Sequence, residues 1–79
     1  MRKIEIFTRL GCGYCSAAKS MLTAMNLDFS EFDLTGDEPG IENLIRRTGR
    51  RTVPQIFING ESIGGYEELA ALRVSGELT

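Results

Sequence analysis

Two cysteines, Cys12 and Cys15, carry the most reactive side chains of this sequence, and they are its only cysteines. Their C-x-x-C spacing follows an apolar run typical of a β-strand, Ile4–Thr8, and opens a helical pattern. In that setting the spacing is typical of a redox-active dithiol, in which one thiolate attacks a disulfide and the second thiol resolves the mixed disulfide. The pair therefore predicts thiol–disulfide chemistry.

Other uses of the two cysteines fit less well. A structural disulfide between them would close a loop of only four residues, for which chain entropy gives only about 2 kcal/mol. A structural zinc ion needs four cysteine or histidine ligands, and this chain has two cysteines and no histidine. The same lack of histidine argues against covalent haem attachment and against Cys–His nucleophilic catalysis. Redox chemistry, or ligation through a thiolate, is what remains.

Size and composition predict a single small domain over residues 1–79. With 42% hydrophobic and 25% charged residues, the composition is that of an ordinary globular protein. No apolar run approaches the roughly 18 residues of a membrane span, and the start shows no apolar signal region. We therefore expect no membrane partner and a cytoplasmic location, where thiols stay reduced. The net charge of -2 argues against a nucleic-acid partner.

Apolar periodicity and turn signals predict the elements that must position the cysteines. They are a strand over 3–8, a helix over 13–26, a strand over 29–34, a helix capped by Asp37 or Thr35 and ended by Gly49, two strands over 55–58 and 61–63, and a helix over 66–74. The turn Asn59-Gly60 makes the last two strands an antiparallel hairpin, and a helical crossover makes the first two parallel. The predicted fold is α/β, with a four-stranded mixed sheet and three helices.

Three motifs stand on this framework: Cys12-Gly13-Tyr14-Cys15 after the first strand, Thr52-Val53-Pro54 before the third, and Gly64-Gly65-Tyr66-Glu67 before the last helix. Their order and spacing resemble those of glutaredoxins, and the resemblance runs from Ile4 to about Leu72. It implies the thioredoxin-like fold, in the order βαβαββα. It also implies a glutathione-dependent oxidoreductase that reduces protein disulfides and glutathione mixed disulfides. Glutathione would be the cosubstrate, with no tightly bound cofactor.

The place of each cysteine on the predicted helix indicates its role. Cys12 lies at the helix start, where unpaired N–H groups and the positive end of the helix dipole favour a thiolate. Arg9 adds positive charge nearby. Cys15 lies one turn further in and is expected to be more buried and less acidic. Cys12 is therefore the expected nucleophile and Cys15 the resolving thiol.

The resemblance also implies a glutathione site. Val53 would offer its backbone to the cysteinyl unit beside a cis Pro54, whereas an X-Pro bond taken from sequence alone is cis only about 5% of the time. Gly65 would let the γ-glutamyl carboxylate approach free N–H groups of the last helix. The other implied contacts are Arg9, Tyr14, Thr52, Tyr66 and Glu67. Tyr14 also fits the apolar stripe of its helix, so a core position is its alternative.

Two features leave other functions open. Gly13 stands where most glutaredoxins have proline. In the family, glycine here is associated with some members that bind a [2Fe-2S] cluster between two protomers through the first cysteine, which is Cys12 in this chain. A tolerated substitution in a monomer is the simpler interpretation. Electron donation to ribonucleotide reductase is a further alternative. The arginines at 46, 47, 50 and 51 form either a solvated face or a patch that attracts anionic glutathione.

Overall fold

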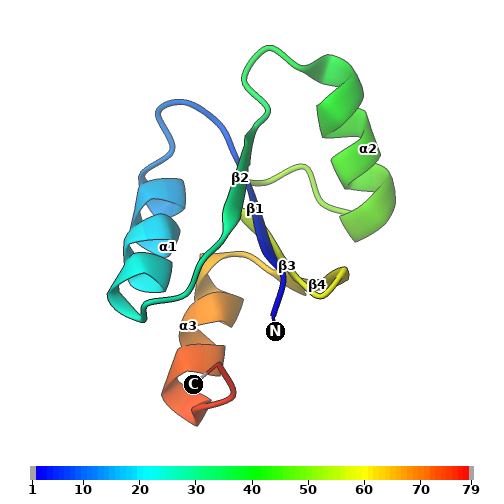
Figure 1. The fold of residues 1–79 in the computed structure, drawn as a ribbon. Helices are drawn as coiled ribbons and strands as arrows, with labels where there is room; N and C mark the ends of the chain where they lie inside the picture. Colours follow the sequence, from blue (N-terminus) through cyan, green and yellow to red (C-terminus); the bar gives the residue numbers. More distant parts are fainter. Residues whose placement is uncertain (1, 79) are drawn as a thin grey trace.

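The chain runs through its helices and strands in the order that the sequence predicts (Figure 1). The structure, a computed structural model, describes residues 2–78. The elements are β1 (Ile4–Thr8), α1 (Gly13–Ala24), β2 (Ser30–Asp33), α2 (Glu38–Thr48), β3 (Gln55–Ile58), β4 (Glu61–Gly64) and α3 (Tyr66–Ser75). No helix in the described part of the chain is long and apolar enough to cross a membrane.

The four strands form one mixed sheet in the order β2-β1-β3-β4. Strand β1 is parallel to β2 and antiparallel to β3, and β3 is antiparallel to β4. In Figure 1, α1 and α3 lie on one side of the sheet and α2 on the other. The predicted mixed sheet with three helices is confirmed. Because β3 is antiparallel to both β1 and β4, the loop after β1, the loop before β3 and the loop after β4 lie at the same end of the strands.

The larger core fills the space between the sheet and helices α1 and α3. Alternation along β1 buries Ile4 and Ile6 on this face, while Leu22 of α1 and Leu69 of α3 are fully buried against them. The remaining buried members are Ala18, Ile56 and Leu78. This packing fixes the start of α1 beside the start of α3, which brings the first and third motifs together.

A smaller core lies under α2. Its buried members are Leu34, Ile41, Leu44 and Phe57. The guanidinium of Arg47 lies over the ring of Phe57, 4.1 Å from its centroid, so this exposed member of the arginine run also covers apolar surface. Arg50 forms an ion pair with Glu68 at 3.4 Å. The four arginines therefore do not form one uniform face.

Two helix ends differ in how well the sequence predicts them. Asp37 caps α2, because its carboxylate accepts the Gly40 N–H at 3.0 Å, and Gly49 ends α2 with a φ of 74°. This settles the choice between Asp37 and Thr35. Helix α1, predicted to reach Asn26, ends at Ala24. Asn26 has a left-handed φ of 58°, which cannot continue a helix.

Candidate active site

Cys12 is the N-cap residue of α1, with an extended backbone conformation. Its sulfur accepts the backbone N–H of Cys15 at 3.1 Å, and its thiol points to the carbonyl oxygen of Val53 at 3.7 Å. An N-cap acceptor takes up one of the unpaired N–H groups of a helix start, and that position favours negative charge. The first and second motifs therefore meet at this sulfur, which remains partly exposed.

Cys15 is buried, unlike Cys12, and its thiol is weakly acidic. Only 2% of Cys15 is exposed. Burial, followed by the hydrogen bond with the Cys12 side chain, raises the pKa of the Cys15 thiol to about 11. Cys15 is thus a protonated thiol at neutral pH until its surroundings change. This asymmetry suits a pair in which one sulfur attacks an outside disulfide and the other acts afterwards.

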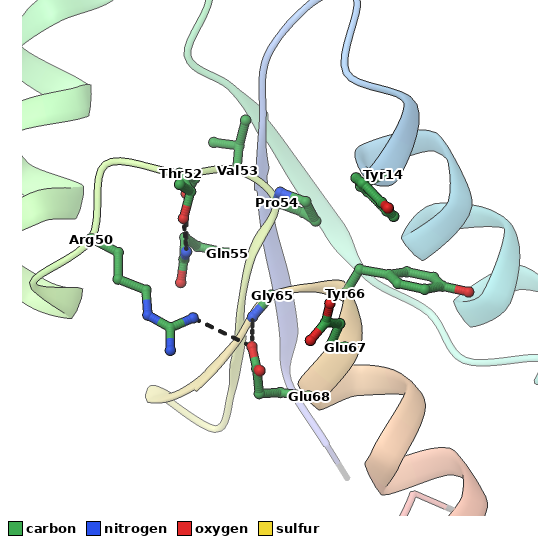
Figure 2. A pocket seen from close by; sticks show the side chains of 10 residues that line it. All are labelled: Tyr14, Arg50, Thr52, Val53, Pro54, Gln55, Gly65, Tyr66, Glu67 and Glu68. Atoms are coloured by element: carbon green, nitrogen blue, oxygen red, sulfur yellow. Dashed lines mark hydrogen bonds and ion pairs between the residues drawn. The ribbon is translucent and has the colours of Figure 1, made fainter.

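A groove with a cavity volume of about 340 Å³ includes Val53, the residue that the Cys12 thiol contacts; Figure 2 shows the side chains that line it. Its lining residues come from three places in the sequence: Tyr14, Arg50, Thr52, Val53, Pro54, Gln55, Gly65, Tyr66, Glu67 and Glu68. Every glutathione contact implied by the resemblance lines this groove, apart from Arg9. Cys12 itself lies at its edge through the contact with Val53.

Tyr14 is a groove residue and not a core residue. Its side chain is 65% exposed, and its ring lies 5.6 Å from the ring of Tyr66. Figure 2 shows both side chains on the same side of Pro54. The alternative that Tyr14 belongs to the core is therefore wrong. The buried face of α1 runs through Cys15, Ala18 and Leu22 instead, and Tyr14 does not belong to it.

Backbone geometry shapes the floor of the groove. The Val53–Pro54 peptide bond is cis, which corrects the trans state that sequence alone favours. A side chain at Gly65 would bring its Cβ within 3.1 Å of the Pro54 carbonyl oxygen. Glycine thus lets the N-terminus of α3 approach the Pro54 loop closely, where a Cβ would make the loop shift by a few tenths of an ångström. The second and third motifs are thereby held against each other.

Arg9 lies apart from the groove. It lines a second cavity of about 310 Å³, together with Cys12, Cys15 and Lys19. The structure therefore brings Arg9 to the cysteines but not to the other implied glutathione contacts.

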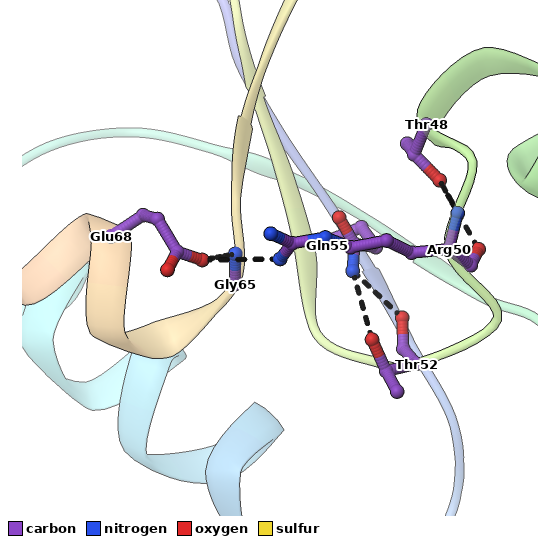
Figure 3. A network of polar contacts seen from close by, with 6 residues as sticks. All are labelled: Thr48, Arg50, Thr52, Gln55, Gly65 and Glu68. Atoms are coloured by element: carbon purple, nitrogen blue, oxygen red, sulfur yellow. Dashed lines mark hydrogen bonds and ion pairs between the residues drawn. The ribbon is translucent and has the colours of Figure 1, made fainter.

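Sequence reasoning did not identify Gln55 as a groove residue. Gln55 is 1% exposed, and its Nε2 donates to the Thr52 carbonyl oxygen at 2.9 Å and to the Thr52 hydroxyl at 3.2 Å (Figure 3). This amide fixes the loop that carries Val53. A glutamine directly after proline, at the start of an otherwise apolar strand, was the available signal.

Glu68 is the second residue that sequence reasoning missed. Its Oε1 accepts the Gly65 N–H at 2.6 Å, and the Arg50 guanidinium lies 3.4 Å from the same oxygen (Figure 3). A glutamate at the third position of a helix, after a residue that can serve as N-cap, is a known capping signal. Glu68 thus fixes the start of α3, where a carboxylate ligand would bind.

The hydrogen bond from the Gly65 N–H, followed by Arg50, lowers the pKa of the Glu68 carboxyl from its usual 4.5. A carboxylate with a lowered pKa stabilises the fold above its usual pKa, and this contribution disappears as the pH falls through the folded-state pKa. We expect acid to lower the thermal unfolding midpoint of the wild type more than that of Glu68→Gln. Melting curves between about pH 6 and pH 3 test this; equal acid sensitivity would contradict it.

Known proteins share this arrangement. A family model described as Glutaredoxin matches residues 4–63. Glutaredoxin 3 of Escherichia coli (strain K12) is 42% identical over 78 residues, which cover 99% of this chain and 94% of that protein. The solution structure of glutaredoxin from Brucella melitensis has a TM-score of 0.85 at 38% identity, covering 96% of this chain and 83% of that one.

A complex of buckwheat glutaredoxin with glutathione is also similar. It superimposes with a TM-score of 0.87 at 30% identity and covers 98% of this chain and 73% of that one. The match of the family model, the relatives similar over nearly the whole chain and the thioredoxin-like fold agree with the paired cysteines at the start of α1. The chain therefore belongs to the glutaredoxin family of glutathione-dependent thiol–disulfide oxidoreductases.

Proposed function

We propose that this chain reduces glutathione mixed disulfides and protein disulfides, with Cys12 as nucleophile, Cys15 as resolving thiol and glutathione bound in the groove. The observation that carries this proposal is the asymmetry of the two thiols. Cys12 is partly exposed at a helix start beside Val53, while Cys15 is buried with a raised pKa. Only Cys12 is placed to meet a disulfide from outside.

In the first route, the Cys12 thiolate attacks the glutathione sulfur of a mixed disulfide. The target leaves as a thiolate and takes a proton from water, and Cys12 carries glutathione through a new disulfide. The thiolate of a second glutathione then attacks the sulfur of that bound glutathione. Glutathione disulfide leaves, and Cys12 returns as a thiolate. In net terms, the mixed disulfide and one glutathione become the free target thiol and glutathione disulfide, so that one disulfide replaces another.

In the second route, Cys12 attacks a protein disulfide and remains linked to the target. Cys15 then loses its proton and attacks the Cys12 sulfur, so that the bond to the target breaks. The target leaves fully reduced, and Cys12 and Cys15 form a disulfide that glutathione later reduces. Cys15 is one helical turn from Cys12, and the Cys15 N–H already contacts the Cys12 sulfur, which supports this second role.

The groove supports glutathione as the ligand, as in the buckwheat complex. The backbone of Val53 would pair with the cysteinyl unit and hold its sulfur beside Cys12. The γ-glutamyl carboxylate would lie at the N-terminus of α3, against the N–H groups of Tyr66 and Glu67. Arg50 borders the same groove and would attract the anionic ligand.

The direct test is the reduction of a glutathionylated peptide by the wild-type protein, with glutathione as reductant and glutathione reductase as the coupling enzyme. We expect turnover that requires both the protein and glutathione. A protein that remains folded but shows no turnover above the uncatalysed rate would overturn the proposal. A flavoprotein disulfide reductase supplied without glutathione serves as the comparison, since turnover only with that reductase would point to a different electron donor.

A substitution at Tyr14 tests the groove separately from the thiols. Removing the exposed ring in Tyr14→Ala should raise the KM for the glutathionylated peptide by about tenfold, because the ring supplies apolar contact area to the ligand. Tyr14→Phe keeps the ring and its contact with Tyr66, so its KM should stay close to that of the wild type. Steady-state kinetics of the three proteins measure this. A large effect of Tyr14→Phe would shift the role from the ring to the hydroxyl.

The proposed targets are glutathionylated proteins and proteins with disulfides, and ribonucleotide reductase is a candidate for the second route. The proposed location is the cytoplasm, where reducing conditions would keep Cys12 and Cys15 as free thiols. A [2Fe-2S] cluster has less support. Such a cluster would take only the Cys12 thiolate from each of two protomers and would leave Cys15 without a role. Thiol–disulfide exchange, by contrast, uses both cysteines of one chain.

A further inference from the structure

Both cysteines line the second cavity, but its other lining residues have no role in the two routes described above. Its charged lining residues are Arg9, Lys19, Glu31 and Asp33. Thr8, at the end of β1, also lines it and is only 2% exposed. Polar and charged side chains from β1, α1 and β2 therefore converge on the space beside the buried Cys15.

Three of these side chains form a connected cluster. One oxygen of Glu31, Oε2, accepts the Thr8 hydroxyl at 2.7 Å and the Lys19 ammonium at 3.0 Å. Exposed ion pairs usually contribute little, because both side chains are free to move. Here a buried hydroxyl also binds the carboxylate and limits its movement, which favours one position of the half-exposed ammonium. The Thr8 hydroxyl and then Lys19 lower the pKa of the Glu31 carboxyl, which keeps it charged.

Lys19 is also tied to Cys15 by the helix. The two residues are four apart on α1, which places them on the same face one turn from each other. Both line the second cavity. The positive charge of Lys19 lowers the pKa of the Cys15 thiol and so opposes the effect of burial. The cation therefore acts on the thiol that must lose a proton in the second route.

We propose that Lys19 is a positioning residue for the resolving step, and that Thr8 and Glu31 hold its ammonium beside Cys15. This inference rests on the proposed function, because it concerns the second route. In that step the Cys15 proton passes to water in the cavity, and the Cys15 thiolate attacks the Cys12 sulfur. The bond from Cys12 to the target breaks, and the target sulfur leaves with the electron pair. Lys19 stabilises the thiolate and is not itself consumed.

The ionisation of Cys15 is measured in a Cys12→Ser background, where Cys15 is the only thiol. The Cβ chemical shift of isotope-labelled cysteine, followed by NMR against pH, reports the thiolate directly. Lys19→Met should move the titration midpoint up by roughly half a pH unit, the order of magnitude expected for one solvent-screened charge, and Lys19→Arg should restore it. Lys3→Met is the matched control, because Lys3 pairs with Glu5 at 3.9 Å and does not line the second cavity.

A double-mutant cycle of Lys19→Met and Glu31→Gln tests whether Glu31 acts on Cys15 through Lys19. If Glu31 holds Lys19 in place, Lys19→Met should have a smaller effect on the midpoint when Glu31→Gln is already present. Equal effects in the two backgrounds would remove Glu31 from the proposal. An unchanged midpoint in Lys19→Met would overturn the proposal as a whole. Neither titration uses glutathione, so these outcomes are independent of whether the wild type shows turnover.

The effect of Lys19 on the resolving step is measured in proteins that keep both Cys12 and Cys15. Release of a reduced target from its mixed disulfide with Cys12 should be about threefold slower in Lys19→Met near neutral pH. Turnover of a glutathionylated peptide by the first route does not need Cys15, so it should fall by less. Equal losses in the two assays would indicate a structural effect and would count against a role in the resolving step.

Discussion

We expect Cys12→Ser to abolish glutathione-dependent reduction of a glutathionylated peptide, with a loss of at least about a thousandfold. A serine hydroxyl at the N-cap of α1 accepts the same hydrogen bond from the Cys15 N–H, so the fold is kept. It does not ionise near neutral pH, and it cannot form a disulfide. The remaining thiol, Cys15, is 2% exposed and has a pKa of about 11, so it does not replace Cys12. The coupled assay with glutathione reductase measures this.

Cys15→Ser is the matched variant, because it makes the same chemical change one helical turn away. It should keep turnover of the glutathionylated peptide within a few-fold of the wild type, since the first route uses Cys12 alone. It should also lose multiple turnover on a protein disulfide, because the Cys12 mixed disulfide is no longer resolved from within. The reverse result, with Cys15→Ser inactive on the peptide and Cys12→Ser active, would exchange the assigned roles.

The fold was predictable because its signals are local. Alternation in Ile4–Thr8 and the Asn59-Gly60 turn each act within a few residues, and each appears in the structure as expected. The ends of elements were less predictable. Helix α1 stops at Ala24 because Asn26 adopts a left-handed conformation, and that choice depends on how the chain must turn to enter β2.

The sequence predicts the site residues that belong to one of the three motifs, but it does not predict those that are positioned by tertiary contacts. The three motifs converge on one groove, but Tyr14 required the structure, because an apolar position on a helix is core only if another element covers it. Gln55 and Glu68 are positioned by contacts with Thr52 and Gly65. Those contacts depend on how the loop before β3 and the start of α3 pack together, which no periodicity encodes.

The second large effect expected is on Gly64, the last residue of β4. Gly64→Ala should lower the free energy of unfolding by about 2–3 kcal/mol. The φ of Gly64 is 107°, and a residue with a Cβ in such a conformation costs about 1–2 kcal/mol. The added Cβ would also lie 2.4 Å from Oε1 of Glu68. Glu68 would have to leave the Gly65 N–H, and loss of such a cap costs about 1 kcal/mol.

Gly60→Ala separates these two causes. Gly60 has a similar φ of 82°, but a Cβ there would meet no atom within 4 Å. Urea denaturation of both variants should therefore give a loss of about 1–2 kcal/mol for Gly60→Ala and a larger one for Gly64→Ala. Only Gly64→Ala should also raise the KM for the glutathionylated peptide, because Glu68 fixes the start of α3 at the groove. Equal effects of the two variants on stability and KM would mean that the contact between Gly64 and Glu68 does not shape the site.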